Sequence, residues 1–236
     1  MRRRLELIRD ERGMTLVEML IAAAAGVVVV AGLSATSIVT LRESNRVTSH
    51  VDADQRARMT MTKVTDQLHS ACFSYENAPV LKESDGSNLI FTRPTPATLT
   101  KVSPTPLKSK ISLSGTTLTQ YDYAATTSAA PWSYSSTASA TTELMTGVNP
   151  VSASVPIFRY YAYSSGKVST TPQAVPLDEA NALRTVQVTI AFKASPLKTP
   201  LSAASDPNSA TAIQNSVLLR FTPSGYESSS EYLPCE

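Results

Sequence analysis

The feature that most constrains this chain is an uninterrupted stretch without charged residues, residues 19–41. Such a stretch is long enough to cross a bilayer as an α-helix, which needs about 20 apolar residues. One carboxylate, Glu18, stands at its start. An ionised side chain at that depth is costly unless another group pairs with it, so an acid placed there indicates a function. The sequence therefore predicts a membrane-spanning helix with one functional acid.

A partner for Glu18 follows from the residues just before it. Cleavage of the chain between Gly13 and Met14 would create an α-amine on Met14. Residues four positions apart lie on the same face of a helix, so this amine and the Glu18 carboxylate could meet within one chain or between two packed chains. Glu18 would then fix the register in which subunits assemble.

The segment R-G-M-T-L-V-E-M-L-I, residues 12–21, resembles the class III signal of type IV prepilins and type II secretion pseudopilins. The resemblance implies that a membrane aspartyl peptidase removes residues 1–13 on the cytoplasmic side and that the same enzyme methylates the new N-terminus at Met14. Thr15 and Glu18 take the places of the family's threonine and acid. Met14 stands where the family most often has phenylalanine.

The same resemblance implies the partners and the location of the protein. The partners are the prepilin peptidase and methyltransferase, other pilin or pseudopilin subunits, the inner-membrane assembly platform and membrane lipid. The protein would cross the cytoplasmic (inner) membrane once, with its C-terminal domain outside the cytoplasm, and would lie in a cell-surface or periplasmic filament after assembly. Basic residues stay on the cytoplasmic side of a membrane, which agrees with the arginine-rich leader.

Charge argues against nucleic acid as a partner. The leader contains five arginines and three acidic residues, which accounts for the whole formal net charge of +2. The rest of the chain is formally neutral and lacks the global basic character that nucleic-acid binding relies on.

Two other interpretations of the N-terminus compete with this one. A conventional signal peptide has a basic start, an apolar core of about 7 to 15 residues and a small-x-small cleavage site. A plain signal anchor could carry an incidental glutamate. The apolar run here is longer than that of a signal peptide and has Glu18 inside it, which favours the prepilin interpretation.

The expected fold class is α+β, with a long N-terminal α-helix packed on a C-terminal antiparallel β-sheet domain, as the resemblance also implies. The chain divides into a cleaved leader, a membrane helix, an amphipathic continuation of that helix and an extracytoplasmic β-rich domain, over residues 1–13, 14–41, 42–76 and 77–236. The continuation is predicted from apolar residues at helical spacing: Val47, Val51, Met61, Val64, Leu68, Cys72 and Tyr75. No proline precedes Pro79, so one helix over about residues 14–73 is expected.

Strands are expected in the C-terminal domain. The candidates are residues 89–93, 110–114, 117–123, 155–163, 184–193 and 216–222. The clearest is T-V-Q-V-T-I-A-F, residues 185–192, whose alternation predicts one buried and one solvated face. The Ser/Thr-rich stretch 124–142 is predicted to be a long exposed loop or a partly disordered insertion.

Two cysteines, Cys72 and Cys235, lie far apart in the sequence. A disulfide between them is chemically permitted outside the cytoplasm, and two unpaired thiols are the alternative.

The loop over residues 83–88 has oxygen ligands that could hold calcium, but D-G-S is first of all a turn signal. No catalytic motif is present, so no catalytic residue, cofactor or metal is expected and the protein is predicted not to be an enzyme.

Five basic residues follow the apolar stretch: Arg42, Arg46, Arg56, Arg58 and Lys63. They could contact lipid headgroups, pair with acids between helices of a filament, or simply form a solvated face.

The predicted function is that of a structural minor subunit of a type IV pilus or type II secretion pseudopilus. Residues 55–71 and the late V-L-L-R-F look similar to W-type minor pilins and J-type minor pseudopilins. The alternative is a membrane-anchored surface binding module, either an adhesin or a DNA-capturing pilin. A membrane-tethered enzyme is the third hypothesis.

Overall fold

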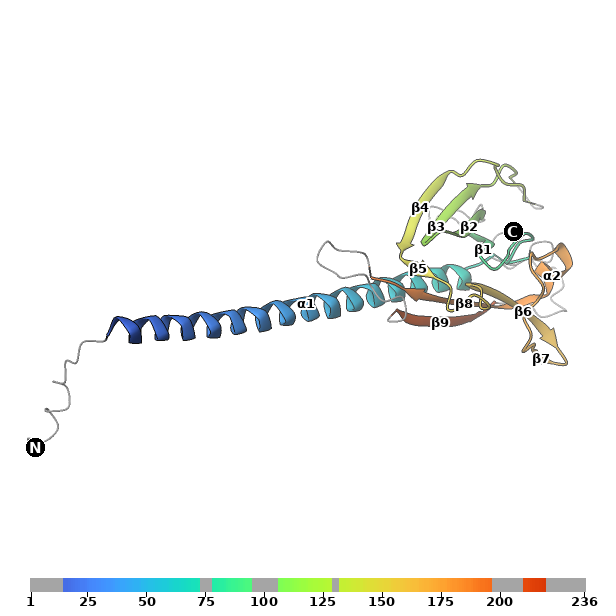
Figure 1. The fold of residues 1–236 in the computed structure, drawn as a ribbon. Coiled ribbons are helices and arrows are strands. Elements are labelled where there is room, and N and C mark those ends of the chain that lie inside the picture. Colours follow the sequence, from blue (N-terminus) through green and yellow to red (C-terminus); the bar gives the residue numbers. More distant parts are fainter. Residues whose placement is uncertain (1–14, 73–77, 95–105, 129–131, 197–209, 220–236) are drawn as a thin grey trace, which may run out of the picture. The chain divides into compact units, whose positions relative to one another are not determined.

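The computed structural model describes residues 15–72, 78–94, 106–128, 132–196 and 210–219. The chain divides into two compact units, Met1–Thr48 and Ser49–Glu236. Over the described residues, the first unit is helical, and the second contains the rest of the same helix, two antiparallel sheets and a short helix (Figure 1).

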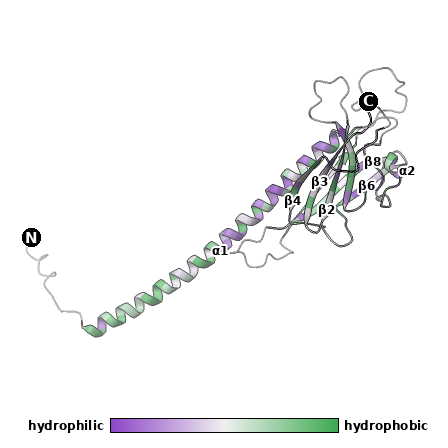
Figure 2. Cartoon of the chain, turned by 90° about the horizontal axis from the view of Figure 1, so that it is seen from above, coloured by the Kyte–Doolittle hydropathy of each residue, from purple (hydrophilic) through white to green (hydrophobic). Residues whose placement is uncertain are grey.

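Helix α1 runs from Leu16 to His69 without a break. This confirms a long N-terminal helix that continues well past the uncharged stretch. The predicted start at residue 14 lies outside the described residues, and the predicted end at about residue 73 is a few residues too late, because residues 70–72 are no longer helical. Apolar residues dominate the first part of α1, and polar residues become frequent in the second (Figure 2). The helix contains no proline, and nothing in its sequence interrupts the backbone hydrogen bonds.

The first sheet has four antiparallel strands in the order β1-β2-β3-β4. The strands are β1 (Asn88–Pro94), β2 (Pro106–Ser114), β3 (Thr117–Ala124) and β4 (Ala140–Thr146). A bulge between Leu118 and Thr119 interrupts the pairing of β3 with β4. Within the described residues β4 pairs with β3 alone, so β4 is an edge strand.

The second sheet is built around β8 (Thr185–Ala194). One edge of β8 pairs with β9 (Thr211–Leu218), and the other pairs with β6 (Phe158–Ser164) and β5 (Val148–Asn149). β7 (Lys167–Val168) forms a hairpin with β6. The short helix α2 (Glu179–Arg184) leads into β8 and is capped by the Asp178 side chain, which accepts a hydrogen bond from the Asn181 N–H at 2.7 Å.

The prediction of one solvated face on β8 was wrong. Thr189 and Ala191, on the face opposite Val188 and Ile190, are 3% and 0% exposed. β8 has neighbours along both edges, and on this face Arg159 of β6 donates to Gln214 of β9 at 3.1 Å, so that their long side chains meet across β8. The Thr189 hydroxyl is satisfied by that of Ser216 at 2.9 Å.

Gly147 joins the two sheets, because it connects β4 of the first to β5 of the second. Its φ is +77°, a conformation that glycine adopts readily and other residues rarely. The Ser195 N–H donates to the Gly147 carbonyl at 2.8 Å, and a Cβ added to Gly147 would lie 2.6 Å from the Ser195 carbonyl oxygen. Both the backbone angle and the close approach therefore require glycine.

Both sheets share one core with α1. The helix contributes buried residues three or four positions apart: Ala53, Ala57, Met61, Val64 and Leu68. Large side chains come from both sheets, among them Phe91, Ile111 and Leu118 from the first and Tyr160, Ile190 and Phe192 from the second.

The predicted apolar face of α1 is confirmed for Met61, Val64 and Leu68 and wrong for Val47 and Val51. These two valines are 60% and 50% exposed. The reason is that burial along α1 begins only at Ala53. Apolar spacing predicts a face, but it does not show how far along the helix that face is covered.

A polar cluster lies on the helix-facing side of the first sheet. Arg93 Nη2 lies 2.9 Å from Asp122 Oδ2, and the Ser109 hydroxyl and Gln120 Nε2 both donate to Asp122 Oδ1. Gln67 of α1 donates to Gln120 Oε1 at 3.2 Å and so ties the helix to the sheet. Burial, the largest single influence, raises the pKa of the Asp122 carboxyl, but the hydrogen bonds from Gln120 and Ser109 and the charge of Arg93 together bring the pKa below its ordinary value.

Most expected strands correspond to observed ones. Residues 89–93, 110–114, 117–123, 155–163 and 184–193 overlap β1, β2, β3, β6 and β8. The last strand starts earlier than predicted, since β9 is Thr211–Leu218, and the predicted end at residue 222 lies outside the described residues.

The stretch 124–142 is not a loop throughout. Ala125 forms an isolated bridge with Tyr134, and β4 begins at Ala140. β4 escaped prediction because its first residues, Ala140, Thr141 and Thr142, are small and exposed and give no apolar alternation.

Candidate membrane-anchoring and assembly site

The start of α1 is fixed by reciprocal hydrogen bonds between Thr15 and Glu18. The Glu18 N–H donates to Thr15 Oγ1, while the Thr15 N–H and hydroxyl both donate to Glu18 Oε2, each at 3.3 Å. This is a capping box, in which the first turn of a helix has its free N–H groups satisfied by two side chains. We did not predict this cap, although its signal, Thr followed three residues later by Glu, stands in T-L-V-E.

The capping box places the only acid of the apolar segment in the first turn of α1. A carboxylate is favoured there because the backbone N–H groups at a helix N-terminus carry partial positive charge. Glu18 is exposed, with no partner from elsewhere in the described chain. It therefore remains accessible to a cationic group that approaches the helix end.

The residues that follow Glu18 form an apolar surface on all sides of the helix. Val28, Val29 and Val30 are 71%, 59% and 62% exposed, and consecutive residues lie about 100° apart around α1. Among the described residues α1 is the one helix that is long and apolar enough to cross a membrane, and its most apolar window is entirely exposed. A helix that is apolar all round is stable only in lipid or among other helices.

Two of the four hydroxyl groups inside this segment, those of Thr36 and Thr40, donate to carbonyls of the helix itself. Thr36 Oγ1 donates to the Leu33 carbonyl and Thr40 Oγ1 to the Thr36 carbonyl, both at 2.9 Å. These bonds match the behaviour of Thr in membrane helices, where water cannot serve as a partner.

Several predicted site residues lie outside the described residues, namely Gly13, Met14 and Cys235. Cys72 is 2% exposed and is disulfide-bonded. The sequence contains one other cysteine, Cys235. The pairing of Cys72 with Cys235 stays a prediction.

The acidic loop before β1 is organised as a turn. Asp85 Oδ1 accepts hydrogen bonds from the N–H groups of Ser87 at 2.7 Å and Asn88 at 2.8 Å, and Asp85 Oδ2 accepts one from Asn88 Nδ2 at 2.9 Å. Both oxygens of this carboxylate thus accept hydrogen bonds within the turn, Oδ1 from the backbone and Oδ2 from the Asn88 side chain. Over the ranges that the structure describes, no group of three His, Cys, Asp or Glu residues is placed to hold a metal ion.

Most cations of the predicted basic band pair within their own helix. Arg56 and Arg58 lie 2.9 and 2.8 Å from the carboxylates four residues before them, Asp52 and Asp54. Arg46 lies 3.8 Å from Glu43. Such pairs support an exposed helix by a few tenths of a kcal/mol each.

Residues 8–34 match the family model described as the prokaryotic N-terminal methylation motif. No curated protein matches the chain. Among solved structures, a type IV-like pilin from Thermus thermophilus is similar at 11% identity and a TM-score of 0.44, over 70% of this chain and 96% of that one. A chain of the GspK–GspI–GspJ complex of the type 2 secretion system of enterotoxigenic Escherichia coli is similar at 13% identity and a TM-score of 0.41, over 72% of this chain and 99% of that one.

Proposed function

We propose that this chain, whose N-terminal motif and helix-on-sheet fold are those of type IV pilins and pseudopilins, is a minor subunit of a type IV pilus or type II secretion pseudopilus. It is a structural subunit and not an enzyme. The observation that supports this role most directly is the exposed apolar segment of α1, which carries a single acid at its capped first turn. The minor role rests on the similarity of residues 55–71 and 217–221 to W-type minor pilins and J-type minor pseudopilins.

Maturation begins with cleavage between Gly13 and Met14 and N-methylation of Met14 by the prepilin peptidase. In the precursor the chain continues before Thr15, and the polar partner of the Glu18 carboxylate is the N–H and hydroxyl of Thr15. Cleavage adds a cationic amine one residue before Thr15, which is within reach of the first helical turn. The carboxylate then has a charged partner in its own chain or in a neighbouring subunit.

Assembly then exchanges lipid for protein around the apolar segment. The helix waits in the cytoplasmic membrane with the C-terminal domain outside the cytoplasm, and it moves into a bundle of similar helices as the filament forms. Apolar packing is comparable in the two environments, so the pairing of Glu18 with an amine favours the bundle and fixes its register. The assembly platform of the inner membrane is the expected partner in this step.

Glu18→Gln separates the charge of this residue from its capping role. Glutamine also accepts the hydrogen bond of a capping box, so α1 keeps its first turn while the carboxylate charge is lost. We expect Glu18→Gln to insert into the membrane and to be cleaved, but not to cross-link into filaments with other pilin-like subunits. Glu43→Gln, which removes an exposed acid of the same helix beyond the apolar segment, should assemble like the wild type.

Mass spectrometry of the chain extracted from its native host tests the processing step. The expected mass is that of a chain that starts at methylated Met14. A functional chain that still starts at Met1, or Glu18→Gln subunits that enter filaments at the wild-type level, would contradict the proposal.

A further inference from the structure

A groove separates the second part of α1 from the edge strand of the first sheet. It consists of a cavity of about 180 Å³ between α1 and β4, which adjoins a cavity of about 560 Å³ lined, among the described residues, by α1 alone; the two share Met59 and Lys63. Leu144 and Met145 of β4 line the smaller cavity from the opposite side. We call this feature, defined by Met59, Lys63, Leu144 and Met145, the α1–β4 groove.

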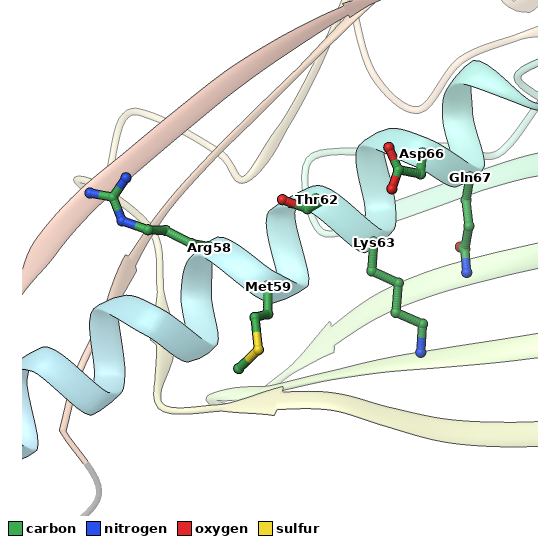
Figure 3. Close-up of a pocket in the computed structure, with 6 residues that line it drawn as sticks. All are labelled: Arg58, Met59, Thr62, Lys63, Asp66 and Gln67. Carbon is green, nitrogen blue, oxygen red and sulfur yellow. The ribbon is translucent and has the colours of Figure 1, made fainter.

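An apolar side chain and a cation from α1 reach into the groove. Figure 3 shows Met59 and Lys63 extending toward β4, whereas Arg58 and Asp66 point away from it. Met59 is 64% exposed, although the nearby Met61 is almost fully buried at 5%. From Ala53 onward the other large apolar residues of α1, Met61, Val64 and Leu68, are buried. Exposure of so large an apolar side chain in this part of the helix marks a contact surface.

Lys63 is a charge without a partner. Arg56 and Arg58 pair with acids one turn earlier, but no ion pair involves Lys63 in the part of the chain that the structure describes. The nearest acid of β4 is Glu143, and the strand register places it on the other face of the sheet. Glu143 pairs with Thr119. The residue beside it, Thr142, pairs with Gln120, whose side chain accepts a hydrogen bond from α1, so Thr142 faces the helix and Glu143 faces away.

The other wall of the groove offers unpaired backbone groups. β4 pairs with β3 along one edge, and within the described residues no strand occupies its second edge. Its residues 140–143 are exposed. An edge strand of this kind is a template for a further strand, whose main-chain hydrogen bonds supply affinity while neighbouring side chains supply selectivity. At its other end β4 is held to the helix by the Thr60 hydroxyl, which donates to the Leu144 carbonyl at 3.3 Å.

We propose that the α1–β4 groove binds an extended acidic segment of another polypeptide. The segment adds to the free edge of β4 as a further strand, covers Met59 with an apolar side chain and places a carboxylate beside Lys63. Charge complementarity selects the segment: Lys63 extends toward β4 with no ion pair among the described residues, whereas Asp66, which also lines the larger cavity, points away from β4 (Figure 3). This contact goes beyond the proposed function, since it uses neither Glu18 nor the apolar part of α1.

The test is peptide binding to the full chain in detergent micelles, measured by fluorescence anisotropy against empty micelles. The probe is the synthetic heptapeptide V-T-E-T-V-T-E, which as a strand carries valine and glutamate in turn on one face, and a second peptide has lysine in place of glutamate. We expect the acidic peptide to bind more tightly than the basic one. One exposed charge pair changes affinity by about threefold. Lys63→Glu turns attraction into repulsion, so it should weaken binding of the acidic peptide by about tenfold. Lys110→Glu makes the same charge change on the opposite face of the sheet and should leave the affinity within about twofold.

Two further measurements separate strand addition from other forms of binding. A version of the acidic peptide N-methylated at alternate amides keeps the side chains but cannot pair with β4, so it should bind at least tenfold more weakly. Equal binding of the methylated peptide, or equal weakening by Lys63→Glu and Lys110→Glu, would overturn the proposal. A second copy in the groove would instead appear as concentration-dependent dimerisation that the acidic peptide reverses, and would overturn the assignment to another polypeptide. Glu18→Gln should bind the peptide like the wild type, so a failure of the assembly mechanism would be seen separately.

Discussion

Substitution of Gly147 by alanine should destabilise the second unit far more than the same change at another glycine with positive φ. Gly147 has a φ of +77°, and a Cβ there would lie 2.6 Å from the backbone oxygen of Ser195. Gly115 has a φ of +59° with nothing within 4 Å of an added Cβ. The two glycines share the conformational demand, and only Gly147 adds a steric one.

The expected size of the effect follows from these two terms. A non-glycine residue at positive φ costs about 1–2 kcal/mol, of which about 0.4–1 kcal/mol is offset because alanine restricts the unfolded chain. Gly115→Ala should therefore destabilise by about 1 kcal/mol. At Gly147 the Cβ contact is with backbone, which cannot rotate away, so β5 and the end of β8 must shift at a cost of about 1–3 kcal/mol. Gly147→Ala should thus lose about 3 kcal/mol in total.

Thermal unfolding of the full chain in mild detergent, followed by near-ultraviolet circular dichroism, measures the difference. About 1 kcal/mol corresponds to roughly 2–4 °C for a unit of this size, so the melting temperature of Gly147→Ala should lie about 4–8 °C below that of Gly115→Ala. Equal melting temperatures for the two variants would refute the steric argument. They would show that the junction between the sheets can relax around a side chain.

The remaining predictions concern the helix–sheet core and the polar cluster. Leu68→Ala should destabilise the protein by about 2–5 kcal/mol, because Leu68 is 1% exposed in the core. Val51→Ala on the same helix should change stability by less than about 0.5 kcal/mol. Urea unfolding of both variants checks this difference. The pKa of Asp122 is lowered in the folded state, so the stability that this carboxylate contributes is present at neutral pH and is lost as the pH falls below about 4 toward the folded-state pKa. Melting temperatures between pH 7 and pH 2 should therefore fall less steeply for Asp122→Asn than for the wild type, and parallel curves would contradict this assignment.

The sequence predicts the fold class because its two halves have distinct patterns. The uncharged stretch and the spacing of Met61, Val64 and Leu68 indicate one long helix, and the alternation in residues 185–192 indicates a strand. What escapes prediction is the division of the strands into two sheets. That division depends on Gly147, whose positive φ and close approach to Ser195 are tertiary properties without a local signal.

The candidate sites, like the sheets, are predictable only where the local sequence marks them. Glu18 stands out in the sequence because an acid in an apolar run is rare, and its capping partner Thr15 is recognisable three residues earlier. The α1–β4 groove has no such signal. Met59 and Lys63 occupy ordinary helical positions, and they become distinctive only beside β4, a strand whose small polar residues gave no pattern to predict.

The hydrogen bonds of Thr36 and Thr40 to carbonyls of their own helix have a consequence for transfer between environments. Both hydroxyls already donate to carbonyls of the same helix, so neither must change its hydrogen-bond partner when the surroundings change from acyl chains to neighbouring proteins. At these two positions the move between lipid and filament breaks no hydrogen bond and forms none. In the proposed assembly, selectivity between lipid and filament can then reside in Glu18, because Thr36 and Thr40 keep the same hydrogen-bond acceptors in both.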